Sequence, residues 1–334
     1  MCPERHVLSG SLHRFHGMAR CFSMSTTLRR QITPAFPLLL LLACGGSQGP
    51  SRPNAPDPPS LPPPVPMPPP PSGPEVMVGA GDIGWCGLPG ADLTAMLLDG
   101  IPGTVFTAGD NAYPSGTRDD FQRCYEPSWG RHKGRTRPIP GNHDYGDGRT
   151  DGFAYFEYFG PNAGPPGLGY YSYRLGAWHI LALDSEISAF PGSAQLEWLR
   201  AELASDSSRC TMALFHTPLF GSGANGGNPQ MQATWNLLYA SGADVVISGH
   251  NHSYERFAPQ DPNGVFDPAK GIREFVAGTG GALLTGFPQV RANSEVRSST
   301  WGVLKLTLWA DRYDWQFIAV PGESFSDSGS AACH

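Results

Sequence analysis

Short apolar runs alternate with helix-like segments along the chain from residue 75 onward. Residues 76–80 and 104–108 are apolar runs of strand length, and residues 91–98 between them carry apolar side chains at helical spacing. Strand, helix and strand in this order predict a parallel unit whose loops lie at the carboxyl ends of the strands. Ligands bind at that edge in open α/β sheets.

The same alternation continues through the rest of the chain. Residues 170–175 and 178–183 predict two paired strands around a Gly-Ala turn, while residues 194–204 and 231–239 predict helices. The other predicted strands are residues 211–215, 245–248, 273–277, 302–308 and 313–320. We therefore predict one α/β domain at residues 75–334, with two sheets in a sandwich flanked by helices and the last strand ending near Pro321.

Residues 1–44 have the pattern of a targeting segment. Arg29 and Arg30 precede an apolar stretch at residues 38–42, and Leu-Leu-Ala is followed directly by Cys44. This pattern resembles a bacterial lipoprotein signal, which implies lipid attachment at Cys44, and Met24 stands at a natural distance for the true start. A short membrane anchor is the competing interpretation, but the apolar run is well below the ~20 residues that span a bilayer. We expect an exported cell-envelope lipoprotein, facing the periplasm or the cell surface.

Residues 45–74 predict a spacer. Between Pro50 and Pro74, 14 of 25 residues are proline, and such a run adopts the extended polyproline II conformation. At ~3.1 Å per residue, this segment could hold a domain up to ~75 Å from its anchor. A ligand for proline-binding modules is the alternative interpretation.

Charge and cysteine content narrow the classes of function. Removal of residues 1–43 takes five Arg and one Glu from totals of 23 basic and 29 acidic residues, leaving 18 against 28, a net charge of −10. This acidity argues against a nucleic-acid groove, which needs clustered Lys and Arg. Beyond the leader and Cys44, the chain has Cys86, Cys124, Cys210 and Cys333. Four cysteines allow three pairings in an oxidising compartment, and we favour Cys86–Cys124 with Cys210–Cys333.

Side chains with metal-binding chemistry follow the predicted strands. The block GDIG at 81–84 places Asp82 after the first strand, and GDNAY at 109–113 places Asp110 after the second, with Tyr113 three residues later. A strand-end Asp beside glycine is usually only a turn residue, and a loop tyrosine usually packs against its neighbours. Each block alone is therefore a weak indication.

Three further blocks offer neutral donors. The block GNHD at 141–144 contains Asn142, His143 and Asp144, ALFH ends at His216, and GHNH at 249–252 contains His250 and His252. A histidine at a strand end is more often structural than a ligand, whereas the His-x-His pair suits two adjacent metals. For Asp144, orientation of His143 and capping of a helix N-terminus are both open.

The five blocks in this order resemble the calcineurin-like metallophosphoesterase superfamily, and the purple acid phosphatases match best. Tyr254-Glu255-Arg256, which the family also shows, follows the last block, and the one small departure is Ala213 where valine is usual. The resemblance spans residues 76–256, and the tyrosine of the second block separates this branch from its relatives. It implies the metallophosphoesterase αββα fold.

The resemblance also implies a site for two metal ions. The first, Fe(3+) in the family, would be bound by Asp82, Asp110, Tyr113 and His252. Asp110 would bridge to a second ion, Zn(2+), Fe(2+) or Mn(2+), bound also by Asn142, His216 and His250. This division is chemically sensible because anionic oxygen donors suit the trivalent ion, and neutral amide and imidazole donors suit the divalent one.

The implied activity is hydrolysis of phosphate monoesters, with diesters as an alternative, by attack of a metal-activated water. His143 would donate a proton to the leaving group or position the phosphate. The competing hypothesis is a lipid-tethered, metal-bearing binding protein without hydrolytic activity. Loss of any of the seven donors would favour that hypothesis, and all seven are present. We expect a small phosphorylated substrate and membrane contact only through Cys44, and no pattern specifies an oligomeric state.

Overall fold

The computed structural model describes residues 73–146 and 151–334. The predicted signal segment, with Met24 and Cys44, and the linker up to residue 72 lie outside the described residues. The strands of one sheet are β1 (Glu75–Ala80), β2 (Thr104–Ala108), β3 (Thr136–Ile139), β11 (Gly302–Leu308), β12 (Arg312–Ala319) and β13 (Ser326–Ala332). Those of the other are β4 (Tyr171–Leu175), β5 (Trp178–Ala182), β6 (Cys210–Leu214), β7 (Val245–Ser248), β8 (Tyr254–Phe257), β9 (Arg273–Ala277) and β10 (Ser294–Ser298).

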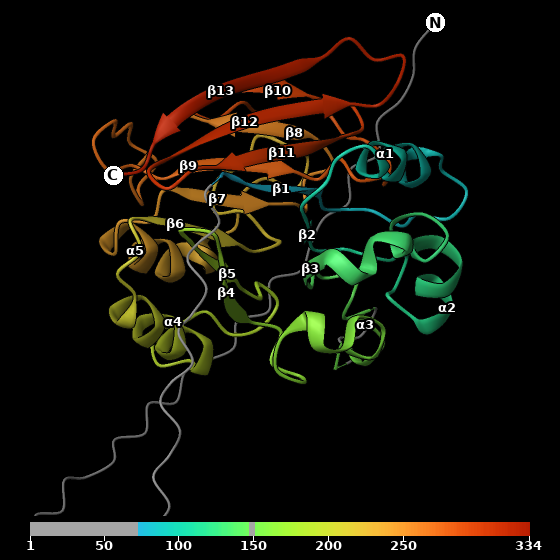
Figure 1. Ribbon diagram of the computed structural model, residues 1–334, viewed down its shortest axis with the longest axis horizontal. Helices are drawn as coiled ribbons and strands as arrows, with labels where there is room; N and C mark the ends of the chain where they lie inside the picture. The colour runs from blue at the N-terminus through green and yellow to red at the C-terminus, as the bar shows by residue number, and fades with distance from the viewer. Residues whose placement is uncertain (1–72, 147–150) are drawn as a thin grey trace, which may run out of the picture. The chain divides into compact units, whose positions relative to one another are not determined.

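Each sheet has a parallel block extended by antiparallel strands. The six-stranded sheet has the order β13-β12-β11-β1-β2-β3, and β1, β2 and β3 are parallel (Figure 1). The seven-stranded sheet has the order β10-β8-β9-β7-β6-β5-β4, and β5, β6, β7 and β9 are parallel. Consequently the loops that follow β1, β2, β3, β6 and β7 all leave from carboxyl ends of parallel strands, where α/β sheets bind ligands.

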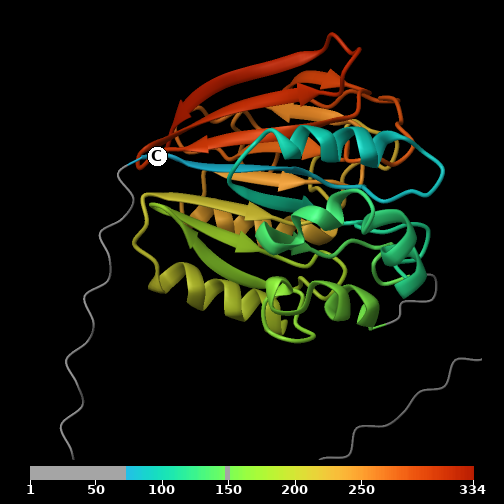
Figure 2. The ribbon, with the colours of Figure 1, turned by 45° about the vertical axis from the view of Figure 1, so that its right-hand side comes forward.

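Helices cover the outer faces of the two sheets (Figures 1 and 2). They are α1 (Gly90–Asp99), α2 (Arg118–Asp120), α3 (Phe153–Phe159), α4 (Ala194–Ser205) and α5 (Gln232–Ala240), with a π-helical turn at Phe121–Tyr125 and 3₁₀ turns at Trp129–Arg135, Gly160–Ala163 and Pro229–Met231. The helices α1 and α3 pack against the first sheet, and α4 and α5 against the second.

Side-chain alternation along the strands divides the apolar residues among three cores. On β5, Ile180 faces the core between the sheets, while its neighbour Leu181 packs beneath α4 and α5. Phe106 of β2 and Phe275 of β9 enter the central core from opposite sheets, and both are fully buried. Because both faces of the parallel strands are covered, these strands read as continuous apolar runs. The predicted two-sheet sandwich flanked by helices is confirmed.

Several elements are absent from the sequence-based description. The strands β3, β8, β10 and β13 were not predicted, and β13 extends the sheet well beyond Pro321. Polar edge strands such as β10 (SEVRS) and β13 (SDSGSAA) lack the apolar alternation that marks a half-buried strand. The helix α3, FAYFEYF, is apolar almost throughout and therefore lacks helical spacing of polar residues.

Two disulfides join segments that are distant in the sequence. Cys86 pairs with Cys124, and Cys210 pairs with Cys333, so the favoured pairing is confirmed. The first links the loop after β1 to the segment after β2, and the second attaches the residue after β13 to β6. Among the described residues, no helix has the length and apolar character needed to cross a bilayer.

Candidate metal centre

The five sequence blocks come together at one edge of the sandwich. Asp82, Asp110 and Asn142 follow β1, β2 and β3 of the first sheet. His216 and the His250–His252 pair follow β6 and β7 of the second. Because the site draws on both sheets, its geometry depends on how the two sheets pack against each other.

Three of the predicted donors have an unusual backbone conformation. The φ angles of Asp82, Asp110 and His250 are 59°, 50° and 67°, in the left-handed region. Among the described non-glycine residues, only Asn293 shares this conformation. Left-handed backbone is costly for most side chains, and it clusters at functional sites where surrounding structure enforces it. The sheets thus aim these three side chains in directions that an ordinary turn would not give.

The hydroxyl of Tyr113 is the meeting point of the first donor group. Its Oη lies 2.9 Å from Asp82 Oδ1, 2.9 Å from Asp110 Oδ2 and 3.1 Å from His252 Nε2. His252 Nε2 is also 3.3 Å from Asp82 Oδ1. The four residues predicted to bind the trivalent ion therefore converge, with Tyr113 only 1% exposed.

Asn142 joins the second donor group. Its Oδ1 lies 3.2 Å from His216 Nε2 and 3.1 Å from His250 Nδ1. His216 Nε2 is in turn 3.2 Å from Asp110 Oδ2, the same oxygen that contacts Tyr113. The two groups therefore share one carboxylate oxygen. The donor atoms of Asp82, Asp110 and His216 lie within 4.8 Å of one another, close enough to hold a cation.

Hydrogen bonds to the backbone orient the donors. His216 Nδ1 donates to Ala108 O at 2.8 Å, and His252 Nδ1 donates to Leu283 O at 2.8 Å, so both rings turn Nε2 toward the centre. Backbone N–H groups hold the second oxygen of each carboxylate: His250 N donates to Asp82 Oδ2, and His143 N to Asp110 Oδ1. Such partners fix the tautomer and direction of metal ligands.

The electrostatics of the buried groups are those of a cation site. Burial raises the pKa of Asp110, but attraction to His216 outweighs it, so the pKa lies well below its usual range. Burial lowers the pKa of His216, but Asp110 raises it to about 10. A proton on His216 therefore balances the carboxylate charge, and a bound cation would replace it. Burial, Asp110 and Asp82 together raise the pKa of Tyr113 well above its usual value, so its phenol is neutral until a cation binds.

His143 differs from the other motif residues in its exposure. Its side chain is 34% exposed, and its Nε2 lies 4.0 Å from Asp110 Oδ2, farther than the donors. Its Nδ1 donates to Pro114 O at 2.5 Å, and its ring lies 4.4 Å from the ring of Tyr113. These contacts hold Nε2 beside the centre while leaving it open to a substrate.

Sequence reasoning missed two residues that organise the site. Asn111 donates from its backbone and its side chain to the carboxylate of Asp144, and also to Ile139 O. Asp144 also accepts from Gly141 N at 2.9 Å, so its carboxylate connects Asn111 of the second block to the third block. It therefore neither orients His143 nor caps a helix, the two roles considered from the sequence. Asn251 accepts from Asn225 N and holds the 221–227 loop beside the last block. Asn111 and Asn251 lie inside the second and fifth sequence blocks, and this position was the one feature of the sequence that could have identified them.

The chemistry of the donor set fits two metal ions. The first group offers carboxylates and a phenol, and the second offers imidazoles and an amide oxygen, with Asp110 common to both. Hard anionic oxygen atoms suit a trivalent ion, and neutral nitrogen and amide donors suit a divalent ion.

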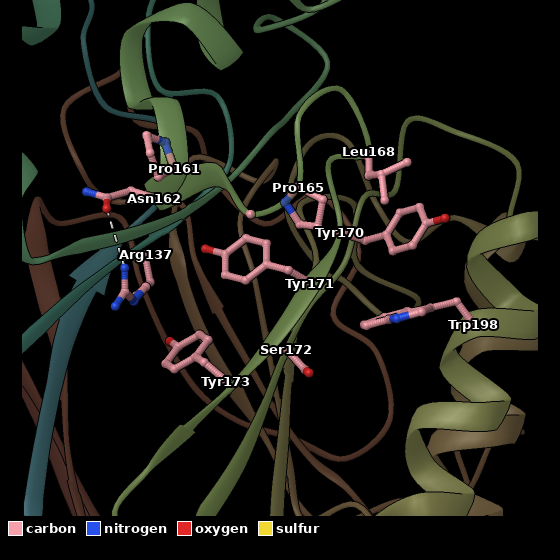
Figure 3. Close-up of a pocket in the computed structure, with 11 residues that line it drawn as sticks. Arg137, Pro161, Asn162, Pro165, Leu168, Tyr170, Tyr171, Ser172, Tyr173 and Trp198 are labelled. Atoms are coloured by element: carbon pink, nitrogen blue, oxygen red, sulfur yellow. Dashed lines mark hydrogen bonds between the residues drawn. The ribbon is translucent and has the colours of Figure 1, made fainter. Parts of the chain in front are cut away.

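A separate pocket of about 470 Å³ lies along the edge strand β4 (Figure 3). Tyr170 and Trp198 pack on one side, with ring centres 5.0 Å apart, and Arg137 and Asn162 lie on the other. None of the predicted metal donors lines this pocket. It is therefore distinct from the metal centre.

Comparison with known proteins identifies the family of this chain. A family model described as calcineurin-like phosphoesterase matches residues 74–254, which is more than half of the chain. Purple acid phosphatase 18 of Arabidopsis thaliana is 36% identical over 118 residues, covering 34% of this chain and 26% of that protein. Purple acid phosphatase 15 of the same plant is 28% identical over 201 residues, covering 49% and 38%. The chain spans well under half the length of these relatives.

Solved structures share the fold at lower identity. The purple acid phosphatase PPD1 from yellow lupin superposes with a TM-score of 0.63 and 21% identity, over 78% of this chain and 54% of that chain. GAP50, the anchor in the inner membrane complex of Plasmodium, superposes with a TM-score of 0.57 and 15% identity, over 79% and 90%. These likenesses show the fold alone. Because the family model matches more than half of the chain, the chain belongs to the calcineurin-like phosphoesterase family.

Proposed function

We propose that this chain hydrolyses phosphate monoesters, and diesters as a second class, at a centre of two metal ions. Fe(3+) would be held by Asp82, Asp110, Tyr113 and His252, and Zn(2+), Fe(2+) or Mn(2+) by Asp110, Asn142, His216 and His250. Family membership supports a metal-dependent phosphoesterase, and the curated relatives are acid phosphatases by name.

The observation that carries this proposal is the position of Asp110 Oδ2. This oxygen lies 2.9 Å from Tyr113 Oη and 3.2 Å from His216 Nε2, so it belongs to both donor groups. A single metal site would not need two groups of donors meeting at one oxygen. The arrangement supports a bridged pair of ions.

In the reaction, the side chains orient the ester and move a proton. Two bound ions would supply a nucleophilic water and positive charge against the phosphoryl oxygens. His143 presents Nε2 to the same space, because its Nδ1 is engaged by Pro114 O. From there it can donate a proton to the departing oxygen. Its Nε2 lies 4.0 Å from Asp110 Oδ2, the oxygen that both donor groups share.

The test uses the purified full chain loaded with metals. We expect two ions per chain by elemental analysis, a visible tyrosinate-to-iron absorption band, and hydrolysis of p-nitrophenyl phosphate and its bis ester. Asp110→Asn should lose bound metal and lower kcat by more than about a hundredfold, because one oxygen serves both groups. Asp184→Asn is the matched control, since this buried carboxylate also accepts from a tyrosine, Tyr145, outside the donor groups. It should keep both ions.

Absence of hydrolysis of either ester, across a metal series and a broad pH range, would refute the proposal. That outcome would favour the metal-bearing binding protein. Full activity of Asp110→Asn would refute the bridging role alone.

We further propose that the protein is exported and tethered by lipid at Cys44. Two disulfides support an oxidising compartment. Labelling of growing cells with radioactive palmitate should mark the wild-type chain and leave Cys44→Ser unlabelled. Equal labelling of both proteins would contradict the anchor.

A further inference from the structure

A small cavity of about 170 Å³ lies directly beside Tyr113. It opens between the loop after β1 and the segment after β2. Trp85, Tyr113 and Pro114 line it together with the Cys86–Cys124 disulfide. The function proposed above does not assign a role to this cavity.

Trp85 forms a fixed aromatic wall of the cavity. Its ring stacks on Tyr113, with centres 4.8 Å apart and an interplanar angle of 25°, yet the residue remains 36% exposed. Trp85 N donates to Ile83 O at 3.0 Å, and the next residue, Cys86, is bonded to Cys124. The indole is therefore held in place while part of its surface stays open to solvent.

The inner wall of the cavity connects to the reactive groups. Tyr113 places its hydroxyl 2.9 Å from Asp110 Oδ2, the shared oxygen of the centre. Pro114 accepts the hydrogen bond from His143 Nδ1 that orients the proposed proton donor. A group bound against Trp85 and Pro114 would thus adjoin a phosphate held at the centre.

The size of the cavity fits one six-membered ring. An apolar cavity of about 150 Å³ is sufficient to bind benzene. Aromatic rings stack favourably in the offset manner that the face of Trp85 allows, and disulfide sulfur packs well against ring edges.

The rim of the cavity carries a net negative charge. Arg123 pairs with Asp119 at 3.2 Å, and both side chains are about 70% exposed. Asp120, which also lines the cavity, accepts from the N–H and the hydroxyl of Thr117. Two carboxylates against one guanidinium disfavour a second anionic group on a bound ring.

We propose that this cavity receives the ring of an aryl leaving group and that Trp85 determines this specificity. The preferred substrates would then be phosphate esters of single-ring phenols that carry no second anionic group. This inference rests on the proposed function, because it concerns the leaving-group side of the same centre. Trp85 acts by contact with the ring and takes no part in proton transfer.

The test compares aryl and alkyl esters in the metal-loaded full chain. Trp85→Leu keeps an apolar cover over Tyr113 but removes the flat ring. It should lower kcat/KM for phenyl phosphate about tenfold relative to glycerol 2-phosphate, the size expected of one lost ring contact. Trp85→Phe should retain most of the preference. Phe266→Ala is the matched control, because it removes an exposed aromatic ring that lies outside the cavity.

A second measurement separates binding from catalysis. Calorimetric titration should show that phenylphosphonate binds more tightly than methylphosphonate, and that Trp85→Leu loses about tenfold in this preference. Equal losses for both esters would mean that Trp85 only supports Tyr113, and an unchanged preference would also overturn the inference. If the wild type hydrolyses no ester, the proposed function fails. In that case the calorimetric titrations still test the cavity. Equal affinity of the wild type for phenylphosphonate and methylphosphonate would refute its role in binding an aryl ring.

Discussion

Replacement of Tyr113 by phenylalanine removes the one oxygen at which the first donor group meets. The hydroxyl lies 2.9 Å from each of two buried carboxylates, Asp82 and Asp110. The hydroxyl has one proton, so it donates to one of the two carboxylates at a time, and a hydrogen bond to a charged acceptor contributes ~1.5–3 kcal/mol. Each carboxylate keeps a backbone N–H partner. We expect Tyr113→Phe to lower the free energy of unfolding of the metal-free protein by ~1.5–3 kcal/mol.

Two assays measure this prediction. Urea denaturation of the metal-free protein gives the change in free energy of unfolding. Visible spectroscopy after iron loading should show the tyrosinate-to-iron band in the wild type and none in Tyr113→Phe. Tyr145→Phe is the control, because Tyr145 donates to a different buried carboxylate, Asp184. It should lose some stability but keep the band. A band that survives in Tyr113→Phe would refute Tyr113 as a ligand.

Three further predictions follow from the same contacts. His143→Ala should lower kcat about a hundredfold or more for glycerol 2-phosphate, but far less for p-nitrophenyl phosphate, because p-nitrophenolate leaves without a proton. Equal losses of kcat for the two esters in a steady-state assay would contradict proton donation by His143. Burial raises the pKa of Asp184 from 3.8 to about 7. Ionisation of this carboxyl therefore opposes folding, and the free energy of unfolding should fall by up to ~4 kcal/mol between pH 4 and pH 7. Urea denaturation of Asp184→Asn should show a weaker dependence of the free energy of unfolding on pH. The same pH dependence in wild type and variant would contradict this assignment. Gly109→Ala should reduce metal content after dialysis, because a Cβ there would lie 2.5 Å from His216 Nδ1. Gly87→Ala has a similar positive φ but open space around it, so equal metal loss in both variants would exclude the contact as the cause.

The sequence predicted the parts of this protein that depend on local pattern. Strands with both faces buried, such as β2 and β6, are continuous apolar runs, and the donors stand immediately after them. Since parallel strands share one carboxyl edge, strand order alone brings Asp82 and Asp110 together. The proximity of Asp82 and Asp110 was therefore predictable, whereas their approach to His216, His250 and His252 depends on the packing of the two sheets.

Contacts made across the chain were not predictable in this way. The bond from Asn111 to Asp144 spans 33 residues and depends on the register of β2 against β3. The stacking of Trp85 on Tyr113 likewise depends on how two loops lie side by side. Sequence spacing identifies ligand types, whereas the surroundings of each ligand are set by sheet geometry that no single segment encodes.

The left-handed backbone at Asp82, Asp110 and His250 restricts which residues can ever occupy these positions. Asp, Asn and His adopt positive φ several-fold more often than other side chains, and glycine alone adopts it freely. Glutamate has the same donor group as aspartate, but it adopts a positive φ less readily, and its longer side chain would have to fit the same space. Donor chemistry and conformational tolerance thus select the same few amino acids independently. Exchange of one metal ligand for another is therefore confined to Asp, Asn and His at these three positions, and glutamate is disfavoured there.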